Sequence, residues 1–128
     1  MILVDTSALI DSLSGPRSSA HQLRGFIQSG ERMALPAIVL YEWLRGPRSR
    51  EELQAQEELF PMDQALPFGA AEAVIAAGLY GKVRSPRGRE IDLAIAATAI
   101  AREAAIWTLN ESDFRDIPGL KLAGSQGS

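Results

Sequence analysis

The chain contains no cysteine and a single histidine, His21, among its 128 residues. Without cysteine the protein cannot form disulfide bonds, bind zinc through thiolates or use a thiol as a nucleophile. A single histidine excludes a nuclease whose acid and base are a pair of imidazoles, and it also excludes a histidine-rich metal site. A chain without cysteine suits the reducing conditions of the cytosol.

Long apolar runs are absent as well. No uncharged apolar stretch approaches the ~20 residues that a membrane-spanning helix needs. The amino terminus reaches a carboxylate at Asp5, so it lacks the basic and apolar regions of a signal peptide. We therefore expect a cytoplasmic protein without a membrane segment.

Excess positive charge is also missing, because 13 basic and 16 acidic residues give a formal net charge of −3 at pH 7. A protein that binds nucleic acid through its overall charge is expected to be basic. Any contact with nucleic acid must therefore come from local clusters of basic residues.

Short apolar runs alternate with helical patterns along the chain. Strands are predicted at 2–4, 33–35, 65–66, 105–109 and 120–122. Helices are predicted at 37–45, 48–60, 69–83 and 90–104, with a helical turn at 110–114. Strands separated by helices predict an α/β fold with a mostly parallel central sheet between two helical layers. We expect one domain over residues 1–123 and a flexible tail at 124–128.

Four acidic residues lie where a solvent-facing charge is not expected: Asp5, Glu42, Asp92 and Asp113. Two of them follow predicted strands, one interrupts an apolar helical segment, and one lies in the first turn of an alanine-rich helix. Each also has a local explanation. Asp5 and Asp92 suit helix amino termini, Asp113 suits a turn, and Glu42 has Arg45 within reach as an ion-pair partner.

The predicted topology brings these four carboxylates toward one edge of the sheet, because functional groups gather beyond the carboxyl ends of parallel strands. Grouped carboxylates repel one another, so they must be protonated or bind cations. An all-oxygen ligand set favours Mg²⁺ or Mn²⁺. Such ions activate water and hold a scissile phosphate, and the chain has neither a GxSxG nucleophile motif nor a Walker loop.

Four segments resemble the PIN-domain nucleases and, among these, the VapC-type toxins of type II toxin–antitoxin systems. In chain order they are MILVDTSALID, LYEWLRG, IDLAIAATAIA and WTLNESDFRDIPGLKL. The resemblance implies a three-layer α/β/α fold with five strands, and a Mg²⁺- or Mn²⁺-dependent endoribonuclease. It also implies an RNA substrate, a homodimer and a small VapB-like antitoxin that inhibits the enzyme.

The resemblance also assigns roles to individual residues. It makes the four acids both catalytic and metal-binding: Asp5, Glu42, Asp92 and Asp113. It implies supporting polar positions for three further residues: Thr6, Thr108 and Asn110. Asp11 and Asp116 match no catalytic position, and we expect them to be surface acids.

Two arginine clusters have no role defined by the family. The first comprises Arg84, Arg87 and Arg89, before Asp92, and the second comprises Arg45, Arg48 and Arg50. Each cluster either is solvated or contacts RNA phosphates at the rim of the site, with Arg45 the candidate from the second cluster.

Beside Glu42, Trp43 and Leu44 either pack in the core or line an antitoxin groove.

Three other interpretations stay open. One is a phosphohydrolase of the haloacid dehalogenase type with Asp5 as nucleophile, although that chemistry normally needs a second aspartate where Ser7 stands. Another is a free-standing PIN nuclease for RNA processing, without an antitoxin. The third is a PIN-like module that binds RNA or protein and does not cut.

Overall fold

A four-stranded parallel sheet forms the centre of the computed structural model, which describes residues 1–124. The strands are β1 (Ile2–Val4), β2 (Met33–Ala34), β3 (Ala105–Trp107) and β4 (Lys121–Leu122). Their spatial order is β2-β1-β3-β4, and all three pairings are parallel. The predicted tail lies outside the described residues except for Gly124.

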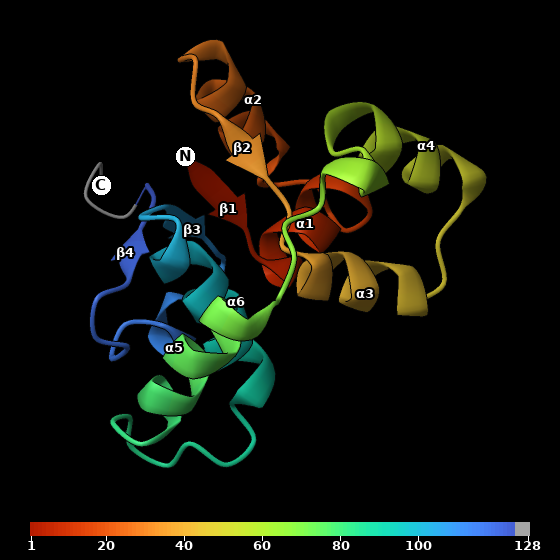
Figure 1. The fold of residues 1–128 in the computed structure, drawn as a ribbon. Helices are drawn as coiled ribbons and strands as arrows, with labels where there is room; N and C mark the ends of the chain where they lie inside the picture. Colours follow the sequence, from red (N-terminus) through yellow and green to blue (C-terminus); the bar gives the residue numbers. More distant parts are fainter. Residues whose placement is uncertain (125–128) are drawn as a thin grey trace.

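Six α-helices connect and cover the strands within residues 1–124 (Figure 1). They are α1 (Thr6–Leu13), α2 (Ala20–Gln28), α3 (Ala37–Arg45), α4 (Arg50–Leu59), α5 (Ala70–Tyr80) and α6 (Glu90–Ala101). Two short 3-10 turns are η1 (Met62–Gln64) and η2 (Glu111–Asp113). None of these helices is long and apolar enough to traverse a lipid bilayer.

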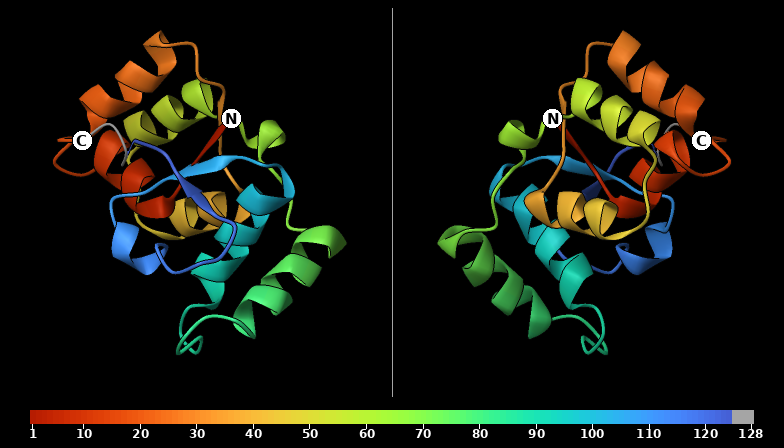
Figure 2. Two further views of the ribbon diagram at one scale, coloured as in Figure 1. Left: turned by 90° about the vertical axis from the view of Figure 1, so that its left-hand side faces the viewer. Right: turned by 90° about the vertical axis from the view of Figure 1, so that its right-hand side faces the viewer.

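The helices form layers on the two faces of the sheet, so the predicted α/β class is confirmed. Figure 2 shows α1, α2 and α4 on one side of the strands and the α5–α6 pair on the other. Helix α3 contacts both α1 and α6. It therefore joins the two helical groups near the ends of β1 and β3.

The sheet has four strands in the described residues, where five were expected. The predicted strand at 65–66 makes only one parallel bridge, between Leu66 and Pro36. The Leu66 amide donates to the carbonyl of Leu35 at 2.8 Å, and the Ala37 amide donates to the carbonyl of Leu66 at 2.7 Å. Pro36 has no N–H and Pro67 follows immediately, so the ladder cannot extend.

Helix α6 is buried around its whole circumference. All seven residues from Leu93 to Ala99 are buried, whereas Ile91 is exposed. The sequence pattern predicted a single apolar face that included Ile91. The run of alanines explains the difference, because small side chains let α5, α3 and β3 approach the helix closely.

Helices α1 and α2 were not predicted as elements. Asp11, expected to be a surface acid, is half-buried and joins the two helices. The Ser19 amide donates to its Oδ2 at 2.9 Å and the Ser19 hydroxyl at 2.5 Å. These hydrogen bonds lower the pKa of the Asp11 carboxyl. Asp11 therefore holds the amino end of α2, as a capping carboxylate does.

Trp43 is fully buried on α3, so the core alternative is correct and the groove alternative is wrong for this residue. The Arg48 guanidinium lies 4.2 Å from its ring centre and donates through Nε to the Trp43 carbonyl at 2.8 Å. Arg48 is thus used to close the end of α3. Leu44, one residue on, is 42% exposed.

These neighbouring side chains give a matched pair of variants. Trp43→Ala is expected to lower the free energy of unfolding by about 3–5 kcal/mol, because it leaves a large cavity in the core. Leu44→Ala is expected to change it by less than about 0.5 kcal/mol. Urea denaturation of the two variants measures both values. A small loss for Trp43→Ala together with a large loss for Leu44→Ala would contradict the packing described.

Candidate active site

Asp5 occupies the junction between the ends of β1 and β3. The two strands pair in register at Val4 and Trp107, and the Asp5 amide donates to the Trp107 carbonyl at 2.9 Å. Thr108, the next residue on the second strand, donates from Oγ1 to Asp5 Oδ2 at 2.7 Å. Asp5 is only 4% exposed. Thr108 thus orients Asp5, while Asn110 is exposed and contacts Thr108 through its backbone amide at 3.0 Å.

Ser7 is a polar member of this group that sequence reasoning missed. Its hydroxyl donates to Asp5 Oδ2 at 2.9 Å and accepts from the Leu109 amide at 3.0 Å. The only signal was a hydroxyl two residues after Asp5, in the first turn of α1. Both side-chain donors engage Oδ2, so Oδ1 receives no hydrogen bond from residues 1–124 and is available to a ligand.

Glu42 approaches this group from α3. Thr6 Oγ1 donates to its Oε1 at 2.5 Å, which links the start of α1 to α3. The Arg45 guanidinium lies 3.3 Å from Oε2. The side chains of Arg45 and Glu42 are 57% and 16% exposed, respectively, so the pair is open to solvent on the arginine side. Such a pair contributes little to stability. It therefore leaves Glu42 available for another role.

Asp92 lies in the first turn of α6, where the negative charges of the other three acids affect the pKa of its carboxyl. Burial raises its pKa to about 6, and the charges of Asp5, Asp113 and Glu42 act in the same direction. The positive charge of Arg89 opposes them. No residue between 1 and 124 donates a hydrogen bond to the Asp92 carboxylate. This half-buried group therefore has no compensating partner except a proton or a cation.

The donor set suits a hard cation, because all four groups are carboxylates. They are not drawn together as a closed cage. Among residues 1–124, no three His, Cys, Asp or Glu side chains lie close enough to hold a metal ion as they stand. The two hollows that Met1 lines have volumes of about 200 and 350 Å³ and include none of the four acids. The four carboxylates thus form an open cluster.

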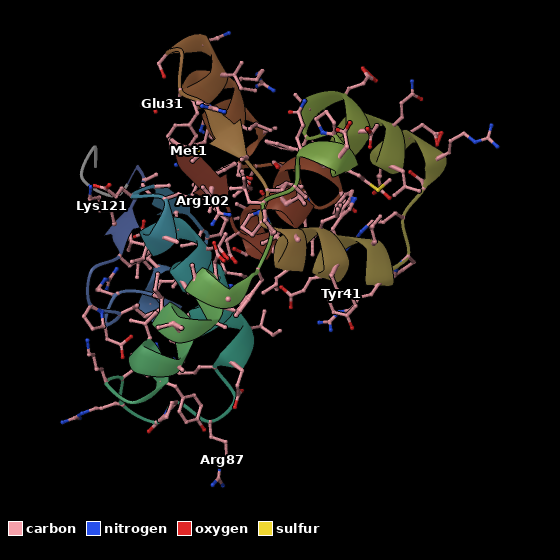
Figure 3. All side chains as sticks on the ribbon, in the orientation of Figure 1. Met1, Glu31, Tyr41, Arg87, Arg102 and Lys121 are labelled. Atoms are coloured by element: carbon pink, nitrogen blue, oxygen red, sulfur yellow. The ribbon has the colours of Figure 1, made fainter. Side chains whose placement is uncertain are left out.

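Arg89, for which the sequence left a solvated loop or a phosphate contact open, is largely buried and is held by groups of the protein itself. Its guanidinium pairs with Asp116 through both carboxylate oxygens, at 2.6 and 3.0 Å. It also donates to the carbonyls of Arg84 and Asp113, at 3.0 and 3.1 Å. Asp116 is therefore an ion-pair partner, and the hydrogen bonds from Arg89 lower the pKa of its carboxyl. The Arg87 side chain extends away from the molecule (Figure 3).

The raised pKa of Asp92 predicts how the stability of the folded protein depends on pH in metal-free buffer. A raised pKa means that the folded protein binds this proton more tightly than the unfolded chain. Stability is therefore lost as pH rises from the ordinary value of 3.8 to about 6. Asp92→Asn is expected to increase the free energy of unfolding near neutral pH by about 1 kcal/mol, after allowance for solvent screening, and to change it little near pH ~4.

Thermal unfolding of wild type and variant across this pH range provides the measurement. Asp63→Asn, which changes an exposed side chain on η1, is the control and is expected to behave like the wild type. If Asp92→Asn destabilised the protein equally at both ends of the range, the electrostatic account of Asp92 would be refuted.

Comparison with known proteins places this geometry in a family. Residues 2–120 match the PIN domain. Over 123 residues the chain is 35% identical to ribonuclease VapC19 of Mycobacterium tuberculosis strain H37Rv, covering 94% of this chain and 98% of that protein.

Solved structures agree in fold. A toxin–antitoxin complex from Klebsiella pneumoniae matches with a TM-score of 0.71 and 26% identity, over 94% of this chain and 95% of that chain. VapBC2 from Rickettsia felis, bound to a DNA fragment from its promoter, matches with a TM-score of 0.72 and 20% identity, over 95% and 97%. The haloacid dehalogenase interpretation is set aside, and the chain belongs to the PIN-domain family.

Proposed function

We propose that this chain is a divalent-metal-dependent endoribonuclease of the VapC toxin type, held inactive by a cognate VapB-like antitoxin. The observation that carries the proposal is that hydrogen bonds from Thr108 and Thr6 hold Asp5 and Glu42 at one edge of the sheet. The half-buried Asp92 lies near enough for both charges to raise its pKa. The 35% sequence identity to a ribonuclease, over 94% of this chain, supports RNA as the substrate. The chain has no cysteine, and its one histidine lies on α2, so an acidic metal site is the chemistry best supplied.

Asp5, Asp92, Asp113 and Glu42 are the residues that would hold Mg²⁺ or Mn²⁺. A bound ion of this kind supplies an activated water and charge neutralisation at the scissile phosphate. Mg²⁺ keeps several of its waters and is usually held by one or two carboxylates, so an open cluster is compatible with binding.

The surrounding residues prepare this cluster for a cation. Thr108 and Ser7 bind one oxygen of Asp5 and leave the other for a ligand. Thr6 orients Glu42 through its hydroxyl. Asp92 has a pKa of about 6, so a proton and a cation compete for the same carboxylate. Low pH therefore opposes metal binding at this group.

RNA contacts are proposed for the exposed arginines around the cluster. Arg45 on α3 and Arg84 and Arg87 in the loop before α6 are exposed. Their positive charges would offset the negative net charge of the chain where a phosphate backbone approaches.

Partner contacts are proposed for exposed apolar side chains. With Trp43 buried, Leu44 remains on α3 as the apolar residue of the expected antitoxin groove. Helix α5 exposes Val74 and Tyr80, which suit the expected homodimer. The similarity to toxin–antitoxin complexes supports an antitoxin partner.

Cleavage of RNA by the purified protein tests the enzymatic part. Activity is expected with added Mg²⁺ or Mn²⁺ and is expected to stop with EDTA. Asp5→Asn and Asp92→Asn are each expected to lower the cleavage rate by roughly two orders of magnitude or more, because each removes a metal ligand. Asp63→Asn is the control and keeps full activity. Cleavage that survives EDTA or both substitutions would refute the proposal, and RNA binding without cleavage would favour a non-catalytic module.

Growth of a bacterial host tests the toxin part separately. Expression of the wild-type chain is expected to arrest growth, and co-expression of the small protein encoded beside it is expected to relieve the arrest. Asp5→Asn is expected to be harmless while still co-purifying with that small protein. An active nuclease with no inhibitory neighbour would point instead to a free-standing PIN nuclease in RNA processing.

A further inference from the structure

Arg89 joins two segments that hold, or lead directly to, acids of the candidate active site. One segment is the loop at 84–89, which leads into α6 and Asp92, and the other is the stretch at 113–116, which begins at the last residue of η2. The guanidinium donates to the carbonyl of Arg84 in the first segment and to the carbonyl of Asp113 in the second. It also forms a two-point ion pair with Asp116. In the described part of the chain, no other hydrogen bond connects these two segments.

The hydrogen-bonding capacity of the Arg89 Nη atoms is fully used by these contacts. Nη1 and Nη2 each make two hydrogen bonds, which matches the four N–H groups they carry. Its side chain is only 21% exposed. A phosphate could therefore reach these N–H groups only by displacing Asp116 or a carbonyl. Arg87, two residues away, is exposed and extends outward (Figure 3).

The backbone of Arg89 also begins α6. Its carbonyl accepts from the Leu93 amide at 2.9 Å, and no side chain caps this helix end. Asp92 lies within the same first turn. Fixing Arg89 therefore fixes the path of the turn that carries Asp92, while the bond to the Asp113 carbonyl fixes the backbone of the fourth acid. One planar group thus connects the supports of two carboxylates that come from distant parts of the sequence.

We infer that Arg89 is a positioning residue that holds Asp92 and Asp113 in register for cation binding, with Asp116 as its counterion. The catalytic consequence rests on the proposed function, whereas the coupling of the two segments does not. A lysine cannot reproduce the fork, because two-point recognition of a carboxylate needs the planar guanidinium. Asp116, which matches no catalytic position of the family, thereby acquires a role in this chain.

Three variants test the inference: Arg89→Ala, Arg89→Lys and Asp116→Asn. One matched control removes a nearby arginine that does not join the segments: Arg115→Ala. Among residues 1–124, the Arg115 side chain makes a single hydrogen bond, to Glu111 at 3.5 Å, and none to the loop at 84–89. Amide hydrogen exchange measures the coupling between the two segments directly. A Mn²⁺ titration, monitored by electron paramagnetic resonance, measures cation binding. Cleavage of a fluorogenic single-stranded RNA gives kcat and KM separately.

Arg89→Ala is expected to speed amide exchange in both segments together, around residues 88–93 and 113–117. It is expected to weaken Mn²⁺ affinity and lower kcat by about 10–100-fold, with KM changed by less than about two-fold. Asp116→Asn is expected to act in the same direction more weakly, and it serves if Arg89→Ala does not fold. Arg89→Lys is expected to restore only part of the loss, and the Arg115→Ala control is expected to match the wild type.

Two results would overturn the inference. One is unchanged exchange in either segment. The other is a raised KM with kcat and Mn²⁺ affinity unchanged, which would make Arg89 a phosphate contact. Failure of the proposed function looks different, because the wild-type chain itself would then neither bind Mn²⁺ nor cleave RNA. If the wild type is active and Arg89→Ala equals it in every measurement, only the inference fails.

Discussion

The hydrogen bond between Asp5 and Thr108 holds the first carboxylate of the candidate active site at the end of the core strands. It forms because β1 and β3 are parallel and in register, so that the residues after each strand meet at the same edge. Ser7 then joins the same oxygen from the first turn of α1. A buried carboxylate needs such donors, and these two hydroxyls fix the Asp5 side chain relative to the strands.

The carboxylates around Asp5 are not equally stabilised by their neighbours. Glu42 has a hydroxyl and an arginine in direct contact, whereas Asp92 accepts no hydrogen bond from residues 1–124 and carries a raised pKa. A carboxylate left without donors beside other carboxylates destabilises the folded protein at neutral pH. Strain of this kind is characteristic of functional sites, where a ligand supplies the missing compensation. The Arg89–Asp116 pair lies just outside the cluster and holds the two segments against that repulsion.

Several elements could be predicted because local signals mark their ends. Helix α3 has the bounds expected for it, since Pro36 precedes it and Gly46 and Pro47 follow. Helices α1 and α2 were not predicted, although Gly15 and Pro16 after α1 are end signals of the same kind as those after α3. The role of Trp43 was undecided. Its burial depends on the packing around α3, which the sequence pattern of that helix does not specify.

The sequence by itself determined the class of fold, the set of unusual carboxylates and the exclusion of thiol and paired-imidazole chemistry, because these follow from composition and local periodicity. Only the tertiary structure decided that Ser7 donates to Asp5, that Arg48 lies over Trp43 and that both Nη atoms of Arg89 are hydrogen-bonded within the protein. Those contacts depend on how loops bring distant segments together, and the path of a loop is set by the packed elements at its two ends.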